Sequence, residues 1–250
     1  MKVKRIKEIE EYIRKHQQVS VMELKEEFNV SINTIRRDIN ELEKSDIIYK
    51  VYGGVVYNEE ATKAYEQRNV DHLFEKQQIG DYCSQFITRN DIVFIDSGTT
   101  THFVLDNVDK DLPFTLITNS LEVINKATTF PNITLLIIGN TYKRTTKSFT
   151  GSADNQVINK FNINKAFMSA TAFSIEQGAS NSDLLENEMK QVMCKKANEI
   201  YLMVDSSKFG DASLFTYCPS SKITKVITDN NISEEYSKKL QKAEVNTIKV

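Results

Sequence analysis

Seven short apolar runs alternate with helical stretches over residues 76–250, and this alternation limits the chain to few folds. Most of the runs are continuously apolar, which is typical of strands buried on both faces of a parallel sheet. The pattern therefore predicts an open, mostly parallel α/β sheet domain. The expected strands are 91–96, 115–119, 133–139, 166–170, 200–205, 225–228 and 247–250. The expected helices are 76–88, 101–107, 121–129, 153–160, 184–198 and 233–243.

Residues 1–56 follow a different pattern, in which apolar residues recur at helical spacing. Ser20 and Glu23 are spaced as a capping box, which begins a short helix that ends near Phe28. A tight turn is expected over 29–31, and Ser31 is a suitable N-cap for the next helix. Helix, short turn and helix form the unit whose second helix enters the major groove of DNA. A hairpin follows, because two β-like runs flank Gly53-Gly54 and form the wing of a winged helix.

The second helix has apolar residues on one side and short polar residues and arginines on the other. Short polar side chains fit base edges, and arginines suit phosphates or guanine. Such a helix also occurs as a merely solvated face, but the order of capping box, turn, helix and glycine-tipped hairpin favours DNA binding. Asp38 is expected to pair with a neighbouring cation or to cap local structure rather than to contact DNA. The residues expected to contact DNA are Ser31, Asn33, Thr34, Arg36, Arg37, Lys50, Tyr52, Gly53 and Gly54.

Small polar residues follow two of the expected strands, at the sheet edge where open α/β folds bind ligands. The loop 97–101 after the first strand joins a glycine to a serine and three threonines, and two readings stay open. It is an anion cradle at a helix N-terminus, or its hydroxyls only cap the helix. Neither Gly-x-x-x-x-Gly-Lys nor Gly-x-Gly-x-x-Gly occurs, which disfavours nucleotides. The candidate ligand residues are Asp96, Ser97, Gly98, Thr99, Thr100, Thr101, Thr118, Asn119, Ser120, Arg144, Lys190 and Lys208.

Two charged residues in the expected helix 184–198 allow two further interpretations. Glu186 and Lys190 stand four residues apart, which is also the spacing of an ordinary surface ion pair. Together with Asp96 they could instead serve an isomerase, which needs a carboxylate base and a group that stabilises the enediolate. No histidine is placed by a motif for that chemistry.

These motifs resemble those of the DeoR-type bacterial transcriptional regulators, and the resemblance covers nearly the whole chain. Residues 6–56 are similar to the DNA-binding domain of that family. The remainder is similar to its sugar-phosphate sensor domain, whose fold resembles ribose-5-phosphate isomerase. The segments that carry this second similarity are 96–100, 118–120, 186–190 and 207–210.

The resemblance implies roles for individual residues. It places a phosphate on the loop 97–100, Asp96 near the sugar hydroxyls, and Lys190 and Lys208 along the pocket. The chain departs from the usual pattern near that pocket, which leaves the identity of the ligand open. The departures are Gly139-Asn140, Asn164 and Ser169-Ala170-Thr171-Ala172.

Composition sets the remaining expectations. The formal net charge is −2, and residues 1–56 hold 11 Lys and Arg against 10 Asp and Glu, so DNA contact depends on local placement of cations. The three cysteines are far apart in the sequence and no apolar run reaches membrane-span length, which favours a cytoplasmic protein with no structural zinc, no cofactor and no membrane partner. We expect a winged helix over 1–56, a connector over 57–75 and a sensor domain over 76–250.

The functional hypothesis is a transcriptional repressor of a carbohydrate-metabolism operon, controlled by a phosphorylated sugar or related metabolite. Its expected partners are a double-stranded DNA operator and that effector. A homodimer or homotetramer is expected because one small DNA-binding domain contacts too few bases. The alternatives are a sugar-phosphate isomerase-like enzyme with an accessory DNA-binding domain, and an interaction protein that does not bind DNA.

Overall fold

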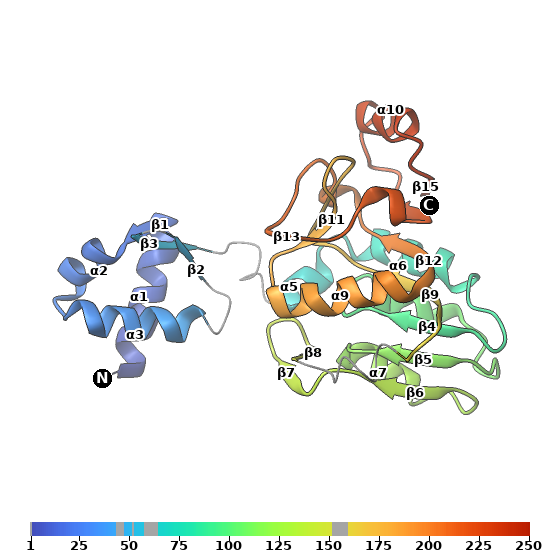
Figure 1. Cartoon of the computed structure of the whole chain (residues 1–250), viewed down its shortest axis with the longest axis horizontal. Helices are drawn as coiled ribbons and strands as arrows, with labels where there is room; N and C mark the ends of the chain where they lie inside the picture. Colours follow the sequence, from blue (N-terminus) through green and yellow to red (C-terminus); the bar gives the residue numbers. More distant parts are fainter. Residues whose placement is uncertain (1, 44–47, 52, 58–64, 152–159) are drawn as a thin grey trace. The chain divides into compact units, whose positions relative to one another are not determined.

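The chain divides into two compact units, Met1–Ala64 and Tyr65–Val250 (Figure 1). The computed structural model describes residues 2–43, 48–51, 53–57, 65–151 and 160–250. The stretch expected to be a connector, 57–75, includes the last residue of a strand of unit 1 and the first helix and part of the second helix of unit 2.

Unit 1 is a helix-turn-helix with a small antiparallel sheet, as the sequence predicts. Ser20 Oγ accepts from the Glu23 N–H at 3.1 Å, and the Glu23 carboxylate accepts from the Ser20 N–H at 2.6 Å, so the capping box is confirmed. Asn29 ends the first helix of the motif in a left-handed conformation with φ 47°. The Thr34 N–H donates to Ser31 Oγ at 3.2 Å, which begins the second helix. The elements are α1 Lys2–His16, β1 Gln18–Ser20, α2 Val21–Phe28, α3 Ile32–Glu43, β2 Ile48–Val51 and β3 Gly54–Tyr57.

The sheet of unit 1 has the strand order β1-β3-β2, and β2 with β3 forms the expected wing hairpin. Gly53 turns the hairpin with φ +80°, a conformation that glycine adopts without strain. Gly54 is buried where β3 approaches β1, because a Cβ there would lie 2.5 Å from Val19 O. Strand β1 was not predicted, since three residues are too few to show a period.

Unit 2 is built on a seven-stranded sheet with the order β15-β14-β12-β9-β4-β5-β6. Every neighbouring pair in it is parallel, so the predicted α/β sheet is confirmed. All seven expected strands are present, with ends that differ from the predicted ones by as many as three residues. They are β4 Ile92–Ile95, β5 Thr115–Thr118, β6 Thr134–Ile137, β9 Ile163–Met168, β12 Ala197–Met203, β14 Lys225–Thr228 and β15 Thr247–Lys249.

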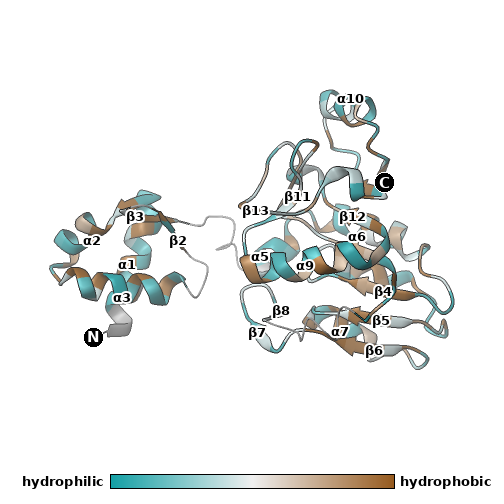
Figure 2. Cartoon of the chain, in the orientation of Figure 1, coloured by the Kyte–Doolittle hydropathy of each residue, from teal (hydrophilic) through white to brown (hydrophobic). Residues whose placement is uncertain are grey.

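The strands other than β15 divide their apolar side chains between two cores, one on each face of the sheet. In β4, Phe94 enters the core that includes Met189 and Met193, whereas Val93 and Ile95 enter the other. This division explains why the strands read as continuous apolar runs, which Figure 2 shows as brown strands. The first face is covered by α9 Leu184–Lys196 and α10 Glu234–Lys242. The second is covered by α6 Leu73–Ser84, the 3₁₀ helix η1 Thr101–Asn107 and α7 Leu121–Ala127.

Several short elements of unit 2 were not predicted, because they are short and lack an apolar run. A hairpin of β7 and β8 follows β6, and an antiparallel sheet of order β10-β11-β13 lies beside the main one. The expected helix 153–160 falls almost wholly on residues outside the described ones. The short elements are α5 Tyr65–Val70, β7 Thr141–Lys143, β8 Ser148–Thr150, β10 Ala172–Ser174, β11 Gly178–Asn181, η2 Ser206–Lys208, β13 Phe215–Cys218 and η3 Ser220–Lys222. Of the helices in the described residues, none combines the length and apolar character needed to cross a membrane.

Candidate functional site

Helix α3 presents a polar face to solvent. Its apolar residues Ile35, Ile39 and Leu42 are buried in the core of unit 1. Asn33, Arg36, Arg37 and Asn40 are exposed. The face expected to contact DNA is therefore free of packing within unit 1, and the core holds the opposite face rigidly in place.

Asp38 anchors this helix from within. It is 1% exposed, and it accepts from Arg5 Nε at 2.7 Å and from Arg5 Nη2 at 3.2 Å. The two parallel bonds form a bidentate pair that ties α3 to α1. Pairing with a nearby cation, as expected, is thus confirmed for Asp38.

The other residues expected at the DNA surface differ in availability. The Ser31 and Thr34 hydroxyls hydrogen-bond each other at 2.9 Å and remain near the surface. Lys50 on β2 forms an exposed ion pair with Glu43, which binds weakly enough to exchange for another anion. Gly53 is exposed at the hairpin tip, whereas buried Gly54 has a packing role. Tyr52 lies outside the described residues.

A second polar cluster gathers at the carboxyl ends of the central strands of unit 2. Asp96, which follows β4, accepts at Oδ2 from the Ser169 N–H at 3.0 Å, the Ser169 hydroxyl at 2.6 Å and the Lys190 ammonium. Lys190 also donates to Ser169 O at 3.0 Å, and the Tyr217 hydroxyl donates to the same carbonyl at 2.7 Å. Residues at the strand ends and Lys190 of helix α9 thus belong to one buried hydrogen-bond network. We call these residues, with the loop 97–101 and residues 118–120, the strand-end cluster.

Lys190 is turned inward on α9 and is only 5% exposed. Its ammonium binds Asp96, and Glu186 accepts instead from the Ser148 hydroxyl at 3.1 Å. The alternative of a surface Glu186–Lys190 pair is therefore wrong. A buried ion pair of this kind costs desolvation, which the extra hydrogen bonds from Ser169 offset.

The loop 97–101 combines both readings that the sequence left open. The Thr101 hydroxyl is fully buried and donates to Asp96 O at 2.6 Å, so it serves the loop itself. Thr100 precedes η1 without a capping hydrogen bond from its side chain, and Thr99 is half-buried. Gly98 lies against Ser169, because a Cβ on it would be 2.2 Å from Ser169 Cβ. The Thr101 hydroxyl thus donates to the loop itself, whereas the Thr99 and Thr100 hydroxyls form no hydrogen bond with any of the described residues.

The polar residues after β5 also differ in the hydrogen bonds that their side chains form. The Thr118 hydroxyl donates to Ile95 O at 2.6 Å, and Ser120 Oγ accepts from the Val123 N–H at 3.3 Å to cap α7. Both hydroxyls therefore support the local fold, and their predicted contact with a ligand stays a prediction. Asn119 Nδ2 reaches Ser97 Oγ at 3.4 Å, so this residue joins the two strand-end loops.

Buried nitrogen groups surround the start of η1. Burial lowers the pKa of Lys76 to about 8, and its ammonium donates to Asp71 O at 2.7 Å and to Arg68 O. Burial, followed by the positive charges of Lys126, Lys76 and Lys147, lowers the pKa of His102 to about 3. His102 is therefore neutral near pH 7, in a positive local potential that favours an anion.

The expected cations Lys208 and Arg144 have looser positions. Lys208 is half-buried in η2 and close enough to Lys76 to affect its pKa. Arg144 is exposed in the turn of the β7–β8 hairpin. That hairpin lies at the end of the sheet to which the arrows of β5 and β6 point in Figure 1. Lys143 on β7 binds Asp183 at 2.9 Å, which ties the hairpin to the start of α9.

The sequence did not identify Lys76, Ser169 or Tyr217 as site residues, although Ser169 lies in a segment that departs from the family pattern near the expected pocket. Lys76 stands on the same helix face as Ile79 and Cys83, so a lysine within an apolar stripe was the available signal. Ser169 follows β9 directly and obeys the strand-end rule that identified the other loops. No local signal points to Tyr217, which reaches the cluster only through the fold.

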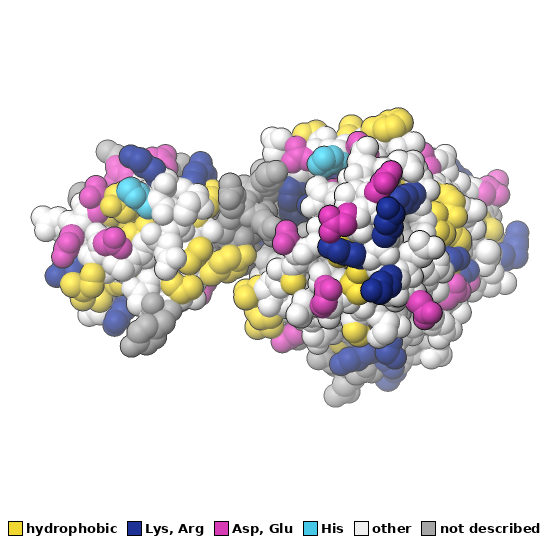
Figure 3. Space-filling view, turned by 90° about the horizontal axis from the view of Figure 1, so that it is seen from above, with side chains coloured by type: hydrophobic (Ala, Val, Ile, Leu, Met, Phe, Trp, Pro, Cys, Tyr) yellow, Lys and Arg dark blue, Asp and Glu magenta, His cyan; other side chains and the backbone are white. Residues whose placement is uncertain are grey.

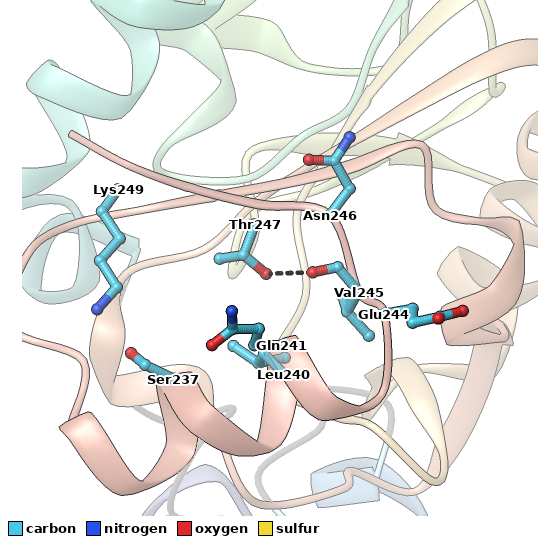
Figure 4. Close-up of a pocket in the computed structure, with 8 residues that line it drawn as sticks. All are labelled: Ser237, Leu240, Gln241, Glu244, Val245, Asn246, Thr247 and Lys249. Carbon is cyan, nitrogen blue, oxygen red and sulfur yellow. Dashed lines mark hydrogen bonds between the residues drawn. The ribbon is translucent and has the colours of Figure 1, made fainter.

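Two other surface features lie apart from the strand-end cluster. Figure 3 shows cationic and acidic side chains interspersed on the displayed face of unit 2, so bulk charge marks no site there. A pocket of about 550 Å³ lies between α10 and β15 (Figure 4). Its residues Glu244, Val245 and Asn246 lead into the amino end of β15, at the opposite end of the parallel strands from the cluster.

Comparison with known proteins agrees with this division of the chain. A family model described as the DeoR-like helix-turn-helix domain matches residues 5–61, and one described as the DeoR C terminal sensor domain matches residues 71–230. The HTH-type transcriptional regulator IolR of Bacillus subtilis is 50% identical over 95% of this chain and 95% of its own length. GolR of Listeria innocua, also an HTH-type transcriptional regulator, is 30% identical over 90% of this chain and 89% of its own.

Two further matches are more distant. The lactose phosphotransferase system repressor of Staphylococcus epidermidis is 29% identical over 95% of this chain and 96% of its own. Among solved structures, ribose 5 phosphate isomerase A from Neisseria gonorrhoeae aligns with 54% of this chain and 53% of that chain, at 11% identity and a TM-score of 0.39. A structural likeness this low carries no argument about activity.

Proposed function

The chain belongs to the DeoR family of transcriptional regulators, and on that premise we propose that it is a repressor whose operator binding is controlled by a phosphorylated sugar. In this proposal unit 1 binds the operator DNA and unit 2 binds the effector. The observation that carries the proposal is the polar face of α3, where Asn33, Arg36 and Arg37 are exposed while the opposite face is fixed in the core. Such a face fits base edges and phosphates in a major groove.

The effector class is supported by the strand-end cluster. The half-buried Thr99 and the buried Thr100 follow Gly98 in the sequence, and the positive charges of three lysines help to lower the pKa of His102, two residues further on. Hydroxyls, backbone N–H groups and nearby cations suit a phosphate. A relative named as a repressor of a lactose phosphotransferase system supports a carbohydrate operon as the target.

Control follows from differential affinity. An effector that binds the DNA-incompetent arrangement more tightly shifts the population away from the operator-bound one. We propose that the working form is a homodimer or homotetramer in the cytoplasm, since a two-fold pair of readers doubles the number of bases contacted. Light scattering of the full chain tests the oligomer directly.

The test is a fluorescence anisotropy titration of the full chain with labelled DNA from upstream of its own gene, at a fixed salt concentration. Arg36→Ala or Arg37→Ala should weaken binding by about 1–3 kcal/mol if the side chain meets a base. Arg89→Ala is the matched control, because it removes an exposed arginine from unit 2 and should leave binding unchanged. Full affinity in both α3 variants would remove the recognition-helix assignment.

Adding sugar phosphates to the same titration tests the effector role and its sign. Release of DNA supports the repressor, whereas tighter binding would make the chain an activator or a co-repressed regulator. Turnover of a sugar phosphate in these samples would instead favour the isomerase alternative.

A further inference from the structure

One edge of the main sheet of unit 2 has no further strand paired to it among the described residues. Strand β6, Thr134–Ile137, is the last strand of the sheet beside β5, and Figure 1 draws it as the lowest strand of that sheet. The hairpin after β6 turns back toward the end of β5, because Ser148 bridges Ser120 and the Phe149 N–H donates to Asn119 O. The hairpin therefore leaves the outer side of β6 open.

The backbone groups of β6 alternate between β5 and this open side. The Thr134 N–H donates to Phe114 O at 3.1 Å, and the Ile138 N–H donates to Thr118 O at 3.0 Å. Even-numbered residues thus bond β5, and the N–H and C=O groups of the odd-numbered residues point outward. The outward residues are Ile133, Leu135 and Ile137. A row of unpaired donors and acceptors of this kind is a template for another strand.

Strand β6 lacks the features by which proteins usually protect an edge strand. Such strands are very short, or carry a lysine or a proline within them. The opposite edge strand β15, Thr247–Lys249, follows this rule, since it has three residues and ends in a lysine. Around β6, in contrast, no charged residue occurs from 127 to 142, and Ile137 is 51% exposed. The edge at β6 is therefore apolar, uncharged and able to pair.

A second copy of β6 complements this edge. In an antiparallel pair centred on Leu135, that residue lies opposite itself and Ile133 lies opposite Ile137 of the second copy, so the outward groups exchange roughly six hydrogen bonds. Ile137 is on the same sheet face as Ile133 and Leu135, which pack against the core of that face. The exposed Ile137 side chain then packs on Ile133 of the second copy, a β-branched pair that stabilises adjoining strands. No like charges are brought together, because the segment carries none.

We propose that two copies of the chain associate through β6, antiparallel and centred on Leu135, so that the two seven-stranded sheets form one continuous sheet. The inference rests on the proposed function for the homodimer itself and adds the surface that forms it. The pairing is self-complementary, as an interface with a two-fold axis requires. Such a dimer carries two copies of α3, the number that an operator with two half-sites needs.

Cysteine cross-linking tests the pairing and its register. In Leu135→Cys the new side chains lie on directly opposite residues, whose Cα atoms are about 5.5 Å apart and within the range of a disulfide. Ile137→Cys is the matched control, because residue 137 and its copy are offset by four strand residues, about 13 Å, which is too far. The three native cysteines of the chain are buried.

Under a mild oxidant, a covalent dimer should be the main product of Leu135→Cys and should be lost in Ile137→Cys. The half-buried residue 135 is less accessible than residue 137 in a single chain, so random collision would give the opposite order. Equal yields in the two variants, or a higher yield in Ile137→Cys, overturn the proposal.

Sedimentation velocity of the full chain over a concentration series measures the association itself. Ile137→Lys places a charge where the single chain faces solvent and the dimer faces Ile133 of the second copy. Because the change occurs twice in each dimer, the dissociation constant should rise about 10-fold or more. Leu214→Lys is the matched control: Leu214 is also exposed, at 59%, and lies outside β6, so its variant should associate like the wild type.

A wild-type chain that remains monomeric, or an Ile137→Lys variant that associates as tightly as the wild type, overturns the proposal. Circular dichroism checks that this variant folds, and if it does not, the cross-linking pair decides. Operator binding is measured on the same samples. A dimer that cross-links as expected but binds no operator refutes the proposed function alone, whereas operator binding by a dimer that fails the cross-linking test overturns this inference alone.

Discussion

Gly98 and Ser169 are expected to be energetically coupled, because the loop after β4 and the loop after β9 meet at these two residues. A Cβ added to Gly98 would lie 2.2 Å from Ser169 Cβ and 2.3 Å from Ser169 Oγ. The oxygen can rotate away, but the Cβ cannot move without its backbone. Gly98→Ala should therefore destabilise the chain by about 1–3 kcal/mol, the usual cost of overpacking a closed site.

Ser169→Gly removes both obstructing atoms and also a hydrogen bond. The Ser169 hydroxyl donates to Asp96 at 2.6 Å, and loss of a bond to a charged group costs about 1.5–3 kcal/mol. In the double variant the new methyl group occupies the space left by the serine side chain. The double variant should thus be more stable than the sum of the single changes predicts, by about 1–3 kcal/mol.

Urea denaturation of the full chain, followed by circular dichroism, measures these free energies of unfolding. Operator affinity serves as the control, because neither residue belongs to unit 1 and none of the three variants should change it in the absence of effector. Single effects that add to within about 0.5 kcal/mol would refute the contact between the two loops.

Two further predictions concern buried charge. His102 has a pKa of about 3 in the folded chain against an ordinary value of 6.5, so between these two values only the unfolded chain binds the extra proton, and the free energy of unfolding decreases as the pH is lowered. From pH 6.5 to 4.5 the wild type should lose about 2–3 kcal/mol more than His102→Gln, measured by urea titration at each pH; parallel pH profiles would contradict the burial of a neutral ring. In unit 1, Arg5→Ala should destabilise more than Asp38→Ala, because Asp38 is 1% and Arg5 26% exposed, so only the carboxylate is stranded in the core. The melting temperatures of both variants show which one is less stable. A lower melting temperature for Asp38→Ala than for Arg5→Ala would show that the Asp38 carboxylate is solvated.

The resemblance of the loop 97–101 to a phosphate cradle was visible in the sequence, but the division of labour within it was not. A run of threonines does not reveal that Thr101 bonds Asp96 O while Thr99 and Thr100 make no such contact with their own loop. The direction of a hydroxyl depends on which carbonyl lies within reach. That carbonyl is placed by the path of the chain through the loop.

Local patterns in the amino-acid sequence determined the elements of this protein. The capping box at Ser20, the Gly53 turn and the apolar runs of the parallel strands depend on neighbours a few residues apart, and short-range sterics and hydrogen bonding decide them. Boundaries were less certain because strand ends depend on pairing with other strands. A strand as short as β1 is held by its pairing with β3, which no local pattern reveals.

The tertiary structure alone decided which polar groups meet. Lys190 reads as one half of a surface pair with Glu186, yet it binds Asp96, 94 residues away, because α9 packs that side against the sheet. Asn119 is oriented by a carbonyl 30 residues later in the β7–β8 hairpin. The spacing of residues in the sequence predicts on which face of a helix, or at which end of a strand, a side chain lies. Which distant side chains it contacts depends on how the helices pack when both faces of the sheet are buried. The chemistry of the strand-end cluster therefore follows from the fold, while the presence of its parts follows from the sequence.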